Sequence, residues 1–179
     1  MKRNFEISLL ASLILVFCIS AGSAFSQPGK TLSPLEERVR LALVTLPYYN
    51  VFDNLAFQVE GTTAILSGEV TRPVLKEAAE AAVKRVTDIQ DVKNNIEVLP
   101  NSPNDDRIRM DAYRAIYSHP DFTQYSIRAY PPIHIIVKDG KLKLIGVVNS
   151  ESDKNRVNIR VKSVEGVFSV INDLVVKKD

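Results

Sequence analysis

The sequence contains no tryptophan, a single cysteine and two histidines, so few side chains are available for thiol chemistry, metal binding or proton transfer. His119 precedes Pro120. His134 lies between two isoleucines, where strand alternation is expected to direct it away from the core and into solvent. Neither histidine has a serine or carboxylate at a spacing that indicates a catalytic triad, and no H-E-x-x-H motif or phosphate-binding glycine loop is present. We therefore expect no catalytic residue, no cofactor and no bound metal.

A strong excess of one charge is also lacking. The chain has 23 lysines and arginines against 21 aspartates and glutamates, a net charge of +2. Nucleic-acid binding usually requires a marked basic excess on one face, and an aromatic content of 7% without tryptophan offers no stacking platform. Nucleic acid is therefore not an expected partner. The balance of 45% hydrophobic and 25% charged residues is typical of a globular protein.

The N-terminus has the pattern of a secretory signal. Lys2 and Arg3 precede an apolar run over 7–21, and small residues follow it. The run is shorter than the roughly 20 residues of a membrane-spanning helix, so we expect residues 1–26 to be a cleaved signal peptide; the alternative is an uncleaved anchor. Cys18 lies inside the apolar run, and bulky residues before it do not fit a lipidation motif. The mature chain would then be exported without any cysteine.

The chain is organised around a block that occurs twice, over 66–98 and over 144–176. Gly68 and Gly146, Asn94 and Asn172, and Val98 and Val176 are three pairs of identical residues, each 78 positions apart. A fixed period without gaps indicates two copies of one small domain. We place the first domain at 34–99, a linker rich in proline at 100–104 and the second domain at 105–177.

Each copy has the same predicted order of elements. Apolar spacing of 3 to 4 residues indicates helices, and alternation indicates strands. Ser33 and Ser150 are expected to cap helices, Thr71 is expected to cap a third, and Asp139-Gly140 is typical of a tight hairpin turn. The expected elements are helix 34–46, strands 55–60 and 64–70, helix 74–86 and strand 92–98, then helix 106–118, strands 133–137 and 142–148, helix 151–164 and strand 168–176.

Several repeated residues are predicted to be structural. Gly68 and Gly146 lie on the inward face of a strand, where the missing side chain would let a helix pack closely against the sheet. Asn94 and Asn172 are polar residues on an apolar face. They could form a ligand pair, but a buried amide usually finds partners in nearby backbone, and we favour that interpretation.

The repeated block contains the motifs Leu66-Ser67-Gly68-x-Val70, Val83-x-x-Val86 and Val92-x-Asn94-x-Ile96-x-Val98, and in the second copy Ile145-Gly146-x-Val148, Val161-x-x-Val164-x-Gly166-Val167 and Val170-x-Asn172-x-Leu174-x-Val176. In these motifs the sequence resembles the BON domain (bacterial OsmY and nodulation). The resemblance spans about 34–99 and 105–177, hence nearly all of the mature chain. Gly166 belongs to the pattern, but the first copy has Asp88 in its place, so this turn is expected to be built differently there.

The resemblance implies an α+β fold of two tandem α-β-β-α-β domains, each a small three-stranded sheet with two helices on one face. It also implies export to the periplasm, a link to envelope stress, and binding to phospholipid membranes. In lipid-binding relatives with two domains, the second domain's first helix and the loop after it look like the membrane-facing element. By position, that element corresponds here to Tyr113, Arg114, Tyr117 and Phe122. The alternative is that these aromatic side chains fill the core beneath a long loop.

The last helix of the second copy differs from its counterpart in charge. It carries Arg156 and Arg160 where the first copy has Ala78 and Ala82. This basic face is either an ordinary solvated surface or an additional site for anionic lipid.

We expect an exported protein of the cell envelope that attaches to anionic phospholipid membranes through its second domain, without enzymatic activity and with no oligomeric state indicated. The alternative is a periplasmic protein-interaction or chaperone-like module that binds other envelope proteins and no lipid.

Overall fold

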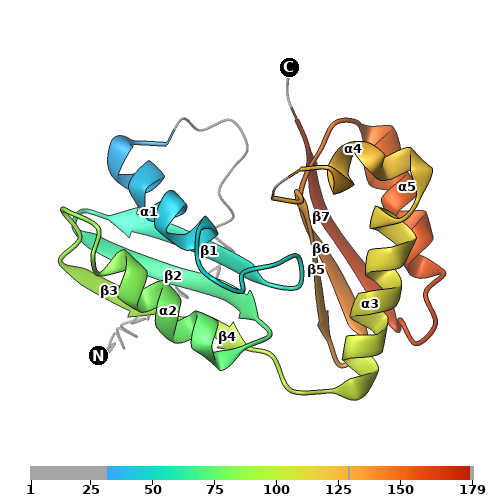
Figure 1. Cartoon of the computed structure of the whole chain (residues 1–179), viewed down its shortest axis with the longest axis horizontal. Helices are drawn as coiled ribbons and strands as arrows, with labels where there is room; N and C mark the ends of the chain where they lie inside the picture. Colours follow the sequence, from blue (N-terminus) through green and yellow to red (C-terminus); the bar gives the residue numbers. More distant parts are fainter. Residues whose placement is uncertain (1–31, 129, 178–179) are drawn as a thin grey trace, which may run out of the picture.

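The computed structural model describes residues 32–128 and 130–177, which form two helix-and-sheet domains (Figure 1). The first contains α1 (Pro34–Val44), β1 (Asn54–Glu60), β2 (Thr63–Val70), α2 (Pro73–Val83), β3 (Asp91–Asn94) and β4 (Glu97–Val98). The second contains α3 (Pro103–Tyr117), the 3-10 turn η1 (Pro120–Phe122), α4 (Thr123–Ser126), β5 (Ile133–Lys138), β6 (Lys141–Val148), α5 (Glu151–Lys162) and β7 (Ser169–Val176). The predicted α+β fold of two tandem domains is confirmed. The expected signal peptide, residues 1–26, lies outside the described residues.

Both sheets have the same topology. The first two strands of each domain pair antiparallel, and the central strand then pairs parallel with the last one. In the first domain the last strand is interrupted and forms two short pieces, β3 and β4, both on β2. In the second domain β7 runs without a break over 8 residues. Figure 1 shows the helices α3 and α5 on the face of the second sheet that points away from the first domain.

Helix ends follow local capping chemistry. Ser33 forms a capping box with Glu36 at the start of α1, and the side chain of Ser150 accepts a hydrogen bond from the Asp153 amide. The structure corrects one expectation, because Arg72 and not Thr71 occupies the N-cap position of α2. The helix α3 begins at Pro103, so the last two residues of the expected linker, 103 and 104, belong to this helix.

Each domain has its own apolar core between helices and sheet. The core of the first domain includes Val39, Leu43, Leu66, Leu75 and Ile96, and that of the second includes Ile108, Ile116, Phe122, Leu144, Val157 and Leu174.

None of the helices within the described ranges is long and apolar enough to cross a membrane.

The paired glycines are required by the sheet, which corrects the expectation of close helix packing. Gly68 and Gly146 have φ angles of 110° and 130°. A Cβ atom at Gly68 would lie 2.1 Å from the carbonyl oxygen of Asn54, and one at Gly146 would lie 1.8 Å from that of Pro132. The close approach therefore comes from the neighbouring chain segment and not from a helix.

The turn before the last strand is also similar in both copies, contrary to expectation. Asp88 and Gly166 have φ angles of 78° and 84°, so the aspartate adopts the same left-handed conformation as the glycine. An ion pair of 2.7 Å joins Asp88 to Arg38.

The two repeated asparagines tie the last strand to the preceding helix. Asn94 donates to the carbonyl oxygen of Lys76 at 2.8 Å, and Asn172 donates to that of Lys154 at 3.1 Å. Each side-chain oxygen also accepts a backbone amide two residues on, at Ile96 and Leu174. The side-chain amides of both asparagines are therefore hydrogen-bonded to the backbone of their own domain.

Candidate functional site at the junction of the two domains

Two of the aromatic residues expected to contact lipid lie in the core. Phe122 is fully buried, and Tyr117 is buried with its hydroxyl donating to the carbonyl oxygen of Ile133 at 2.5 Å. The same hydroxyl accepts the Ile133 amide at 3.1 Å, and burial raises the pKa of the phenol. The expectation that these two side chains enter a membrane is wrong, because Tyr117 at the end of α3 and Phe122 in η1 both belong to the core of the second domain.

Tyr113 and Arg114 remain at the surface. Tyr113 is 37% exposed, and its ring lies 5.0 Å from that of Tyr117 and 6.1 Å from that of Phe52, measured between centroids. Arg114 is exposed and pairs with Asp111 at 2.8 Å. Tyr113 therefore faces a residue of the first domain.

Arg156 and Arg160 lie together on another side of the second domain. Arg156 forms ion pairs with Asp153 at 2.5 Å and with Asp121 at 3.2 Å, and Arg160 contacts the imidazole Nε2 of His119. Both arginines line a groove of about 470 Å³ that Tyr113 does not reach. The six residues proposed for lipid contact thus do not form one site, and two carboxylates compensate the charge of Arg156.

The two domains are joined by a loop of the first domain. The loop between α1 and β1 places Val51 in the core of the second domain, and the Val51 carbonyl oxygen accepts the Ile135 amide at 2.7 Å. His134 does not point into solvent as expected. Its Nδ1 atom lies 2.6 Å from the carbonyl oxygen of Asp53, its ring stacks on Tyr49 with centroids 5.6 Å apart, and burial lowers its pKa.

A buried carboxylate holds this loop in shape. Asp53 is fully buried and accepts hydrogen bonds from the amide and hydroxyl of Thr71, at 2.7 Å and 2.8 Å, and from the amide of Asn50 at 3.2 Å. The side chain of Asn50 in turn accepts the Phe52 amide at 2.8 Å. The position of Phe52 is therefore determined by a chain of hydrogen bonds that begins at the start of α2.

The outer face of the second sheet forms the rest of the junction. Leu99 packs with Ile136 and Ile145, which point away from the core of their own domain. Two ion pairs flank this contact, between Lys138 and Glu97 at 2.5 Å and between Lys143 and Glu69. Both domains therefore contribute to one continuous interface.

A cavity that we call the aromatic junction pocket opens beside this interface. It has a volume of about 620 Å³. Tyr130 lines the pocket and is 63% exposed. Arg72 also lines it, and its guanidinium carbon lies 5.4 Å from the ring centroid of Tyr48, which is 66% exposed. The pocket is lined by Val44, Tyr49, Asn50, Val51, Phe52, Arg72, Tyr113, Tyr130, Pro131, Pro132 and His134.

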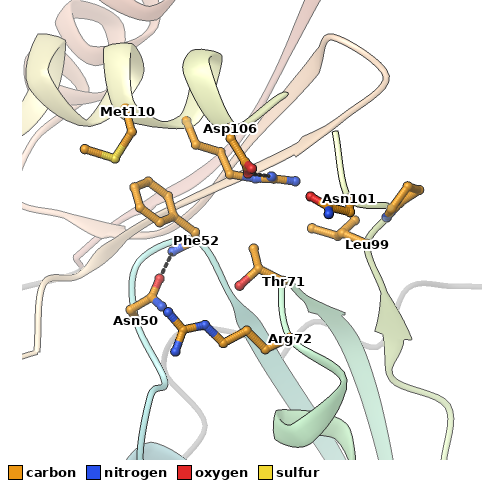
Figure 2. Close-up of a pocket in the computed structure, with 10 residues that line it drawn as sticks. Asn50, Phe52, Thr71, Arg72, Leu99, Asn101, Asp106 and Met110 are labelled. Carbon is orange, nitrogen blue, oxygen red and sulfur yellow. Dashed lines mark hydrogen bonds and ion pairs between the residues drawn. The ribbon is translucent and has the colours of Figure 1, made fainter. Parts of the chain in front are cut away.

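A second cavity, the polar junction pocket, adjoins the first and shares Asn50, Phe52 and Arg72 with it. Its volume is about 330 Å³. Figure 2 shows Asn50, Thr71 and Arg72 of the first domain on one side, and Asp106 and Met110 of α3 on the other. Arg109, Leu99, Pro100 and Asn101 complete the lining. The larger pocket is therefore lined mainly by aromatic and apolar side chains, and the smaller one carries amides and charges.

Comparison with known proteins identifies the family of both halves. The family model described as BON domain matches residues 33–100 and again residues 104–178. No curated protein matches the chain. Two solved structures of CdsD, a structural protein of the type III secretion system of Chlamydia trachomatis, are similar at 12% and 11% identity, with TM-scores of 0.29 and 0.32. The first match covers 82% of this chain and 99% of the CdsD C-terminal domain, and the second covers 78% and 90%.

Proposed function

Because the chain belongs to the BON domain family through two tandem domains, and members of this family are typically envelope-associated binding proteins, we propose that it attaches to anionic phospholipid membranes of the cell envelope. Attachment of this kind fits a role in envelope integrity under stress. The contact surface in this proposal is the mouth of the aromatic junction pocket, which replaces the second-domain surface expected from the sequence.

The observation that supports this proposal is the exposure of tyrosines at one cavity. Tyr113 and Tyr130 of the second domain line it, and Arg72, which also lines it, lies over the ring of Tyr48 from the first domain. Tyrosine is favoured at the depth of lipid headgroups, because its ring is apolar and its hydroxyl is polar. A cation close to an anionic membrane contributes about 1 kcal/mol, so Arg72 would favour anionic over neutral lipid.

The test is flotation of the protein with vesicles of phosphatidylglycerol and phosphatidylcholine, compared with vesicles of phosphatidylcholine alone. We expect binding to the anionic vesicles that weakens as salt is raised, since exposed charges are screened over about 10 Å at 0.1 M salt. The double variant Tyr48→Ala/Tyr130→Ala should lose binding. The matched control is Phe168→Ala, which removes an aromatic ring that is 82% exposed and lines neither junction pocket. No binding of the unmodified protein at low salt would overturn the proposal.

A second candidate function is a protein-interaction module. It is favoured by exposed apolar side chains at the start of the edge strand β7, where Phe168 and Ile171 lie at the surface. An extended partner segment could pair with such an edge. Binding to a protein partner would not depend on lipid and would be lost in Phe168→Ala. The same variant should retain vesicle binding, so it separates the two candidate functions.

A further inference from the structure

The polar junction pocket contains a buried cation whose hydrogen bonding is incomplete. Arg109 is only 4% exposed and donates to Asp106 at 2.5 Å and to the carbonyl oxygen of Val137 at 2.6 Å. Its Nε atom is buried and has no hydrogen-bond partner within residues 32–128 and 130–177. A buried charge is costly unless it is paired and fully hydrogen-bonded. Its carboxylate partner is more than half exposed, so the compensation of this charge is only partial.

A second cation borders the same pocket. Arg72 has no ion pair with a carboxylate among the described residues and lies over the Tyr48 ring. Figure 2 shows its guanidinium extending toward Asn50. The amide of Asn101 lines the opposite wall and is an additional donor. By contrast, the hydroxyl of Thr71 already donates to Asp53 and can only accept.

The charges of this pocket determine which anion fits. Arg72 and Arg109 each contribute one positive charge and Asp106 one negative charge, so the lining carries a net charge of +1. A phosphodiester carries one negative charge and would balance this lining. A phosphate monoester carries about 1.5 to 2 negative charges at neutral pH and would be repelled more strongly by Asp106.

The neighbouring aromatic pocket determines what the phosphodiester is attached to. Phe52 lines both cavities, so a phospholipid with its phosphate beside Arg72 would place its glycerol near Phe52 and the atoms beyond the glycerol against Tyr49 and Tyr113. This wall suits an apolar chain. We propose that the two junction pockets together bind a single anionic phospholipid, with the phosphodiester in the polar pocket and the start of an acyl chain in the aromatic one. This inference rests on the proposed membrane attachment and names the site at which one lipid is recognised.

The test measures binding of short-chain dihexanoyl phosphatidylglycerol, kept below its micelle concentration, to the full chain by titration calorimetry. Removal of a charge-assisted hydrogen bond typically lowers affinity about tenfold or more, and we expect this loss in Arg72→Gln. The matched control is Arg107→Gln, which removes the same charge from an exposed residue outside both pockets and should bind within about twofold of the unmodified protein. Asn101→Ala is a second variant at an exposed position and should weaken binding without affecting the fold.

Three further ligands identify the source of the phosphate. Glycerophosphoglycerol, which lacks acyl chains, should bind more weakly than the short-chain lipid, and inorganic phosphate should bind more weakly still. Dihexanoyl phosphatidylcholine should bind weakly, because its headgroup has no net charge. Equal affinity for the phosphatidylcholine lipid, or unchanged affinity of Arg72→Gln, would overturn the inference.

The outcomes also distinguish this inference from the proposed function. Vesicle flotation without binding of the short-chain lipid would leave membrane attachment standing and remove the lipid site. Binding of the short-chain lipid without flotation would support the site and overturn attachment to bilayers.

Discussion

The carbonyl oxygen of Val51 accepts the backbone amide of Ile135 at 2.7 Å, so a loop of the first domain pairs with the outer edge of β5 in the second. The same loop buries the Val51 side chain in the second core. Unpaired strand edges tend to pair with other chains, and this contact covers one of them within the molecule. The junction is therefore part of the fold of the second domain as well as a link between domains.

Val51→Ala is expected to destabilise the second domain. Removing two buried methyl groups lowers the free energy of unfolding by about 2 kcal/mol. Urea unfolding followed by circular dichroism would measure this change. The control Val74→Ala alters a half-exposed valine on α2 and should change stability by less than about 0.5 kcal/mol. Equal effects of the two substitutions would contradict the burial of Val51 in the second core.

His134 is expected to make the junction sensitive to acid. Burial lowers its pKa below the value of about 6.5 that it has in an unfolded chain, so the unfolded chain binds the proton more tightly. Its contribution to stability is therefore complete above about pH 6.5 and decreases as pH falls from there toward the lowered pKa of the folded state. Unfolding free energies measured from pH 7.5 to pH 5 should show this decrease in the unmodified protein.

The variants separate this histidine from the other one. His134→Gln should remove the histidine-linked part of the decrease, whereas His119→Gln should retain it. An unchanged pH profile in His134→Gln would show that other groups are responsible.

Much of the architecture could be predicted from local patterns. The hairpin turn at Asp139-Gly140 has φ angles of 52° and 71°, as its sequence predicted, and the 78-residue period predicted two similar domains. These features depend on residues near one another in the chain. The direction of His134 was mispredicted because strand alternation assigns an outward residue to solvent, whereas here another domain covers that face.

The junction itself had weaker signals. Ile136 and Ile145 are apolar residues at outward positions of their strands, which indicates a covered sheet face. Tyr48, Tyr49 and Phe52 are three aromatic residues in one short loop, which is a signal for a contact surface. The prediction instead favoured the second copy, where the corresponding loop is longer and also contains aromatic residues. Docking of two domains depends on contacts between distant residues, so no periodic pattern marks it.

Gly146→Ala is expected to be strongly destabilising. The new Cβ atom would lie 1.8 Å from the carbonyl oxygen of Pro132, at a φ angle of 130° that other residues rarely adopt. We expect a loss of at least about 3 kcal/mol, since both the backbone strain and the clash must be relieved. The control is Gly61→Ala, also at positive φ but with no atom near the added carbon, and it should lose only about 1 kcal/mol. Thermal unfolding of both variants would decide; similar losses would show that the clash is unimportant.

The ring of Phe122 is expected to stabilise the fold, and the ring of Tyr130 is expected to contact lipid. Phe122→Leu should lower the free energy of unfolding by about 1 to 2 kcal/mol, because it reduces the volume of a fully buried side chain, and should leave vesicle binding unchanged. Tyr130→Ala should have nearly the opposite effect, with little loss of stability and weaker vesicle binding, because this side chain is largely exposed at the pocket. Urea unfolding and flotation, performed on the same preparations, measure both properties. A folded Phe122→Leu protein that no longer binds vesicles would return this ring to the membrane surface and would contradict its assignment to the core.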